Sequence, residues 1–155
     1  MSFTILGLNP KEFQPLFALS DGELQHRGIM RMVATAKPGY PCRVTLEDAD
    51  PGESVLLLNY ESHKTRSPYR SSYAIYVREK ATTSKSYIDE LPPVFIGRPI
   101  ALRIFDKDGM LISADLDTIG ELITKIKKAF KNPNAAYIHA HNAMHGCFAA
   151  EIRRS

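Results

Sequence analysis

Only one segment of this 155-residue chain is long and periodic enough to form a crossover helix. Its apolar residues recur at helical spacing over residues 119–130, and Asn132-Pro133 ends the pattern. The other apolar segments are short and separated by turn residues, which indicates about eight or nine strands. Because parallel strands need long crossovers, these strands must be joined mainly as hairpins. We therefore predict an α+β fold with two helices and a mainly antiparallel sheet of about eight short strands, able to curl strongly or close into a barrel.

Short sequence motifs predict where several of these helices, strands and loops lie. The turn Asp106-Lys107-Asp108-Gly109 predicts a hairpin between two apolar runs. Ser20 with Glu23, and Thr118 with Glu121, have the spacing of capping boxes and predict two helix starts. Residues 42–46 read as a strand, and residues 61–72 as a long polar loop.

Composition limits the classes of protein to consider. The apolar content of 44% suits one core, so residues 1–155 are expected to form a single domain. The net charge of +3 comes from 20 basic and 17 acidic residues spread along the chain, without the clustered basic face of a nucleic-acid binder. We expect no nucleic-acid partner.

Other features of the sequence indicate where in the cell the protein is expected. The longest large-aliphatic run, residues 55–58, is far too short for a membrane span, and the first residues lack the pattern of a signal peptide. We expect a cytoplasmic protein with no membrane partner. Its two cysteines, Cys42 and Cys147, are then expected to be reduced.

The C-terminal stretch is the densest in reactive side chains. Three of the five histidines and one of the two cysteines lie between His139 and Cys147. Strand alternation predicts a hairpin in which Ala140 lies opposite Phe148 and His141 lies opposite Cys147, with the apolar residues on the core face. The histidines would then lie on the face away from the core. The polar loop at residues 61–72 is expected near them.

Five segments together carry a family resemblance: the opening Phe3-Thr4-Ile5-Leu6-Gly7-Leu8, residues 17–24, residues 41–49 with Pro51-Gly52-Glu53, Pro68-Tyr69-Arg70 and the segment from His139 to Phe148. In these segments the chain resembles family 1203 of the bacterial domains of unknown function. The resemblance spans nearly the whole chain and implies a small bacterial protein. The family implies no activity, cofactor or site.

Three functions are compatible with these residues, and the first is metal binding. His139 and His141 lie two positions apart on one strand face, and His145, Cys147 or His63 could complete a site for zinc or another transition metal. The same pair also occurs on ordinary solvated sheet faces.

The second function is thiol chemistry. Cys147, with His141 as its base, could act as a nucleophile or redox centre in an enzyme. Against this, a free cysteine more often packs as a small buried hydrophobe.

The third function is non-enzymatic. His63, Tyr69, Arg70 and Arg43 could form a binding module for an anionic small molecule or partner, since the arginine fork suits carboxylates and phosphates. The sequence leaves open whether the protein is an enzyme, which ligand it binds and its oligomeric state.

Overall fold

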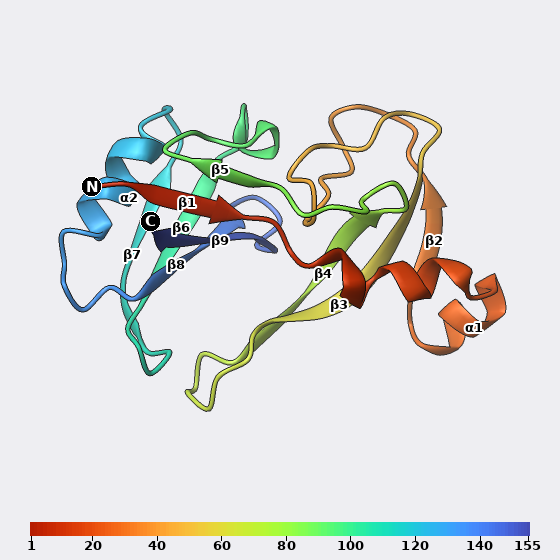
Figure 1. Cartoon of the computed structure of the whole chain (residues 1–155), viewed down its shortest axis with the longest axis horizontal. Coiled ribbons are helices and arrows are strands. Elements are labelled where there is room, and N and C mark those ends of the chain that lie inside the picture. Colours follow the sequence, from red (N-terminus) through yellow and green to blue (C-terminus); the bar gives the residue numbers. More distant parts are fainter.

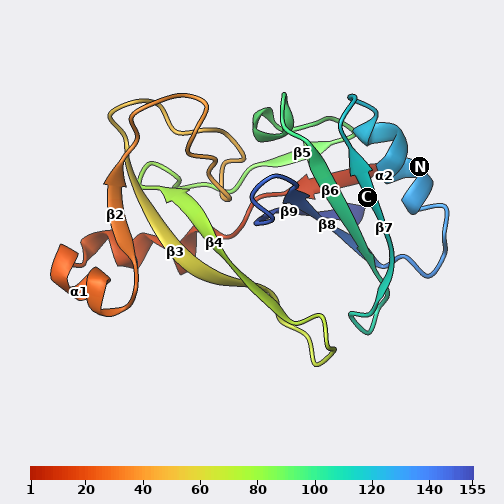
Figure 2. The same ribbon diagram turned by 180° about the vertical axis from the view of Figure 1, so that it is seen from behind.

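Nine strands form two antiparallel sheets in the computed structural model, which describes all 155 residues. The two sheets lie side by side, and both chain termini lie at the larger one (Figures 1 and 2). This confirms the α+β prediction with mainly antiparallel pairing. The larger sheet remains open, because β5 and β7 form its two edges.

The larger sheet has six strands in the order β5-β1-β9-β8-β6-β7. Its main core contains Leu102, Ile138 and Ile152, and the helix α2 covers this core with Leu122 and Ile126. The predicted hairpin around Asp106–Gly109 joins β6 to β7, as expected. The bounds are β1 Phe3–Leu6, β5 Ser86–Ile88, β6 Ile100–Phe105, β7 Leu111–Asp117, α2 Leu122–Ala129, β8 Tyr137–Asn142 and β9 Phe148–Arg154.

The smaller sheet has the order β2-β3-β4 and a second core that includes Leu56, Ile75 and Val77. The Ser20–Glu23 capping box is confirmed at the start of α1, with both reciprocal hydrogen bonds present. The remaining bounds are α1 Asp21–His26, β2 Met30–Val33, β3 Ser54–His63 and β4 Ser71–Arg78, with 3-10 turns at Pro10–Glu12, Gln14–Ala18 and Pro93–Phe95. Neither α-helix is long and apolar enough to cross a bilayer.

The second predicted capping box is wrong. The helix α2 begins at Leu122, and Glu121 makes no side-chain capping bond. Gly120 has a φ of 89°, a left-handed conformation that interrupts any helix running from Thr118. The Asp117 carboxylate instead accepts a hydrogen bond from the Glu121 backbone N–H at 3.0 Å.

The register of the C-terminal hairpin also differs from the prediction. Ala140 pairs with Ala150 and His141 pairs with Phe148, with a β-bulge between them. The extra residue is Ala149, which joins the main core, so Phe148 turns to the face that carries the histidines. The predicted pairing of Ala140 with Phe148 and of His141 with Cys147 is therefore wrong.

The histidine face is not the solvated face that alternation suggested. His139 and His141 are each only 2% exposed, because β3 and β4 cover this side of the larger sheet. Tyr73 on β4 lies edge-on to His141 with ring centroids 5.0 Å apart, and His63 on β3 lies at the same distance from His139. The larger sheet thus has a second buried face, which is polar and aromatic.

The polar loop predicted at residues 61–72 is shorter than expected, because β3 runs to His63 and β4 begins at Ser71. Its expected position near the histidine face is confirmed by His63, whose ring lies edge-on to that of His139. The tip of the β3–β4 hairpin is fastened to the β6–β7 turn by Ser67, whose hydroxyl donates to the Gly109 carbonyl oxygen at 2.7 Å.

Candidate functional site

A cavity of about 420 Å³ lies where the two sheets meet. We call it the inter-sheet cavity. Its walls come from the segment between β2 and β3, from β3 and β4, from the residues before β6, and from the end of β8 with the loop that follows it. Its lining residues are Gly39, Pro41, Arg43, Leu57, Tyr73, Ala74, Tyr76, Arg98, Asn142, His145 and Cys147.

The backbone of Arg43 is held on both sides. Its N–H donates to the Tyr76 carbonyl oxygen at 3.1 Å, and its own carbonyl oxygen accepts from the Leu8 N–H at 2.8 Å. Gly7 permits this close approach, since a Cβ there would lie 2.0 Å from the Val44 carbonyl oxygen. The strand predicted at residues 42–46 is wrong. The chain makes a single bridge to β4 at Cys42 and then turns, with Leu46 at a φ of 55°.

The Arg43 side chain is buried without a carboxylate partner. It is 3% exposed, and its Nε donates to the Phe148 carbonyl oxygen at 2.8 Å. Nη1 donates to the Pro41 carbonyl oxygen at 2.6 Å, and Nη2 donates to Cys147 Sγ at 3.1 Å. A guanidinium has more N–H groups than these three contacts use. Burial lowers the pKa of Arg43, and the sulfurs of Cys147 and Cys42 offset part of this effect.

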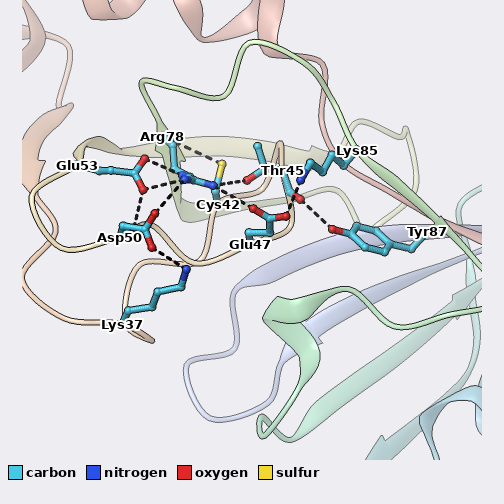
Figure 3. A network of polar contacts seen from close by, with 9 residues as sticks. All are labelled: Lys37, Cys42, Thr45, Glu47, Asp50, Glu53, Arg78, Lys85 and Tyr87. Carbon is cyan, nitrogen blue, oxygen red and sulfur yellow. Dashed lines mark hydrogen bonds and ion pairs between the residues drawn. The ribbon is translucent and has the colours of Figure 1, made fainter.

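A network centred on Arg78 fixes the segment that carries Arg43 (Figure 3). Nε and Nη2 of Arg78 donate to the two carboxylate oxygens of Glu53 at 2.9 and 2.8 Å. Nη1 reaches Thr45 Oγ1 at 3.3 Å and Glu47 Oε2 at 3.4 Å, and the backbone N–H of Arg78 points at Cys42 Sγ. Arg78 of β4 therefore contacts both ends of the segment from Cys42 to Glu53, Cys42 through its backbone N–H and Glu53 through its side chain.

The second arginine of the cavity already has an acidic partner. Arg98 makes a two-pronged contact with Asp48, with N–O distances of 2.7 and 2.9 Å. Burial acts to raise the pKa of Asp48, but the hydrogen bonds from Arg98 and from the Gly39 N–H bring it below its ordinary value. This pair connects the larger sheet to the segment between β2 and β3.

Cys147 contacts Arg43, and no hydrogen bond joins it to His141. Gly146 at a φ of 79° turns the chain, and its carbonyl oxygen accepts a hydrogen bond from His141 Nδ1 at 2.9 Å. Cys147 Sγ contacts Arg43 Nη2 and, at 3.7 Å, Asn142 Nδ2. The prediction that His141 serves as a base for Cys147 is therefore not supported by the geometry.

His63 and His139 belong to a separate cluster, beside a smaller hollow of about 260 Å³. His63 Nδ1 donates to the Tyr69 carbonyl oxygen at 2.8 Å, and Nε2 lies within hydrogen-bond distance of the Tyr137 hydroxyl at 2.7 Å. His139 Nε2 lies 3.3 Å from Glu151. Burial lowers the pKa of His139 despite this carboxylate, so the ring is neutral near pH 7.

The predicted metal ligands do not converge. His139 contacts Glu151, His141 contacts a backbone carbonyl, and His145 is exposed at the mouth of the inter-sheet cavity. No group of three or more histidine, cysteine or acidic side chains is arranged to hold a metal ion. These residues do not fit a zinc or other transition-metal site.

The residues predicted to bind an anionic ligand are also separated. Arg43 lies in the inter-sheet cavity, whereas His63, Tyr69 and Arg70 lie at the end of the β3–β4 hairpin. Arg70 is exposed and pairs with Glu61 at 3.1 Å. Of that set, only Arg43 lines the cavity.

Sequence reasoning missed several residues of the cavity, namely Arg98, Asn142, Tyr73 and Tyr76. Arg98 sits between Gly97 and Pro99, which marks a turn but gives no sign of a site. The tyrosines looked like ordinary strand residues. Their role depends on β4 forming the edge of the smaller sheet that faces the C-terminal hairpin.

Lowering the pH from about 7 to about 5 is expected to remove roughly 2 kcal/mol from the free energy of unfolding through His141 alone. Burial lowers the pKa of His141 from 6.5 to about 4. Between these values the unfolded chain binds a proton that the folded protein does not, so stability falls as the pH falls through this window. Urea unfolding at both pH values measures the effect.

His141→Gln is the control for this pH effect, because it removes the titrating ring. Its unfolding free energy should depend less on pH by a similar amount, whatever its absolute stability. His139 acts in the same direction and should leave a residual slope. An unchanged slope in the variant would show that His141 is not held neutral by the fold.

One comparison with known proteins gives a match. Residues 39–154 match the model of a family described as "Protein of unknown function (DUF1203)". No curated protein and no solved structure matches the chain. The matched span includes every residue that lines the inter-sheet cavity. This chain therefore belongs to the DUF1203 family.

Proposed function

We propose that the protein binds a small organic carboxylate in the inter-sheet cavity, with Arg43 as the charge partner of the ligand. One observation carries the proposal. Arg43 is 3% exposed and lines a cavity, yet no carboxylate pairs with its guanidinium. Buried charges in proteins are normally paired, so this arginine is suited to an anion that arrives from solution.

The charge of the cavity supports an anionic ligand. Arg43 and Arg98 both line it, and none of its lining residues is acidic. Asp48 offsets Arg98 through their two-pronged contact, which leaves the charge of Arg43 uncompensated. A carboxylate fits a guanidinium well because two parallel N–H···O bonds can form.

The walls favour a ligand with a flat apolar body. Tyr73, Tyr76 and Leu57 are among the residues that line the cavity. The volume of about 420 Å³ lies within the range typical of small-molecule sites, where apolar walls surround a few polar groups that fix orientation. Arg103 donates to the Tyr73 hydroxyl at 2.9 Å, which holds that ring in place.

We further propose that the whole chain works as one domain, since both sheets contribute to the cavity. A bacterial, cytoplasmic setting and the absence of nucleic-acid and membrane partners stay predictions from the sequence.

Benzoate is expected to bind and stabilise the protein, whereas the neutral isostere benzamide is not. At a concentration one hundred times its Kd, benzoate should add about 2.7 kcal/mol to the free energy of unfolding. For a chain of this size that raises the melting temperature by roughly 5–10 °C. Thermal melts and calorimetric titration with both compounds measure the difference.

Arg43→Lys is the matched variant, because it keeps the positive charge but loses the two-pronged geometry. Its benzoate affinity should fall at least tenfold while its fold, monitored by circular dichroism, is retained. Acetate and inorganic phosphate serve as further probes of the anion site. If none of the three anions binds more tightly than benzamide, the cavity is not an anion site and the proposal is wrong.

A further inference from the structure

We infer that Cys147 is a modification site, at which the protein exchanges disulfides with small acidic disulfides of the mercaptocarboxylate class. The inference rests on the proposed function, because Arg43 would hold the carboxylate of the incoming molecule. It goes further by assigning a covalent reaction to a residue of the same cavity.

The two cysteines differ in accessibility. Cys147 is partly exposed and lines the inter-sheet cavity, while Cys42 is fully buried at 0% exposure. Cys42 Sγ faces the backbone N–H of Arg78 at 3.4 Å, inside the core of the smaller sheet. A reagent in solution can therefore reach only Cys147 while the protein is folded.

The surroundings of Cys147 select the charge of the reagent. Arg43 Nη2 lies 3.1 Å from Sγ, so a carboxylate bound to the remaining N–H groups of this guanidinium lies next to the sulfur. Exposed His145 lies at the same cavity, and no acidic side chain lines it to attract a cation. Reactive cysteines characteristically occupy partly exposed, electropositive surroundings of this kind.

Hydrogen bonds to the backbone hold the loop that carries Cys147, both before and after this residue. The Asn142 N–H donates to the Cys147 carbonyl oxygen at 3.0 Å, and the Gly146 N–H donates to the Asn142 carbonyl oxygen at 2.7 Å. Arg43 Nε binds the carbonyl oxygen of the next residue, Phe148. The position of Sγ relative to the guanidinium is therefore fixed, which reduces the entropy lost when a bound disulfide reaches it.

The reaction needs no additional oxidant. Cys147 releases its proton to water, and the thiolate attacks one sulfur of the disulfide. A new S–S bond forms at Sγ while the old S–S bond breaks. The departing half leaves as a thiolate and takes up a proton from water. An excess of a small thiol reverses the exchange.

The test compares three aliphatic disulfides of different charge, those of mercaptoacetate, mercaptoethanol and cysteamine. Each rate of adduct formation, followed by mass spectrometry, is divided by the rate of the same disulfide with free N-acetylcysteine amide, a thiol without a carboxylate. We expect the normalised rate to be highest for the anionic disulfide and at least tenfold higher than for the cationic one. Cys147→Ser should abolish the adduct, and Cys42→Ala should retain it.

Equal normalised rates for the three disulfides, or an adduct on Cys42 in the folded protein, would overturn the inference. Because the comparison uses the unmodified protein, it does not depend on a variant that folds poorly. Arg43→Lys adds a second measurement, in which the preference for the anionic disulfide should shrink.

Benzoate separates this inference from the proposed function. If benzoate binds but the anionic disulfide shows no advantage, the cavity is an anion site and Cys147 is not its modification site. If the anionic disulfide reacts faster but benzoate neither binds nor slows the exchange, the carboxylate-binding proposal fails instead. Binding together with protection by benzoate is the result that we expect.

Discussion

Replacing Arg78 with methionine is expected to reduce the free energy of unfolding by about 3–5 kcal/mol, because it leaves a buried carboxylate without its partner. The Glu53 side chain is 3% exposed, and both of its oxygens accept hydrogen bonds from Arg78. Burial acts to raise the pKa of Glu53, and these hydrogen bonds bring it below its ordinary value. Urea unfolding of the variant and the parent protein gives the difference.

Two controls identify the cause of this loss. Lys37→Met removes an exposed cation from the same network and should have little effect. The double variant Arg78→Met with Glu53→Gln removes the buried charge as well, so it should be clearly more stable than the sum of the single changes predicts. Strict additivity would show that Arg78 acts through packing alone. Because this network fixes the segment of Arg43, Arg78→Met should also weaken benzoate binding.

Phe148→Ala is expected to cost about 3–5 kcal/mol, the range for removing a buried aromatic side chain. Phe148 is 2% exposed and packs between the sheets, with ring centroids 5.2 Å from His139 and 6.5 Å from Tyr60. The cavity left by alanine would open the contact between the larger sheet and β3. Thermal or urea unfolding measures the loss.

Phe148→Leu keeps much of the buried volume and should cost less than half as much. Ala149→Gly tests the bulge itself, since Ala149 belongs to the main core and Phe148 does not. If Phe148→Ala were tolerated, the face of the larger sheet that carries the histidines would not be a packed interface. The sequence had assigned His141 to a solvated face, where its loss costs little, whereas its 2% exposure predicts a larger cost.

Local chemistry was enough to predict several elements. The Ser20–Glu23 capping box starts α1, because both reciprocal bonds form within one turn of chain. The hairpin between β6 and β7 follows from the turn Asp106–Gly109. The Asp106 carboxylate accepts a hydrogen bond from the Met110 N–H, and Gly109 adopts the positive φ that the turn requires. Alternation also assigned Ile138, Ala140, Ala150 and Ile152 to the core of the larger sheet.

Predictions that relied on an uninterrupted alternation of strand residues or an uninterrupted helical spacing were wrong. One extra residue at Ala149 sends Phe148 to the opposite face, and Gly120 delays the start of α2 to Leu122. Strand alternation has a period of two, so a single bulged residue reverses every face assignment beyond it. The sequence contains no signal for the bulge.

By itself, the sequence determined the fold class, the antiparallel pairing of short strands and the dense set of reactive residues near the C-terminus, because these depend on spacing between near neighbours in the chain. Only the tertiary structure decided which reactive groups meet. Arg43 and Cys147 are 104 positions apart, yet Nη2 and Sγ lie 3.1 Å from each other. Their contact results from the smaller sheet packing beside the larger one, and long-range packing of this kind has no periodic signature in the sequence.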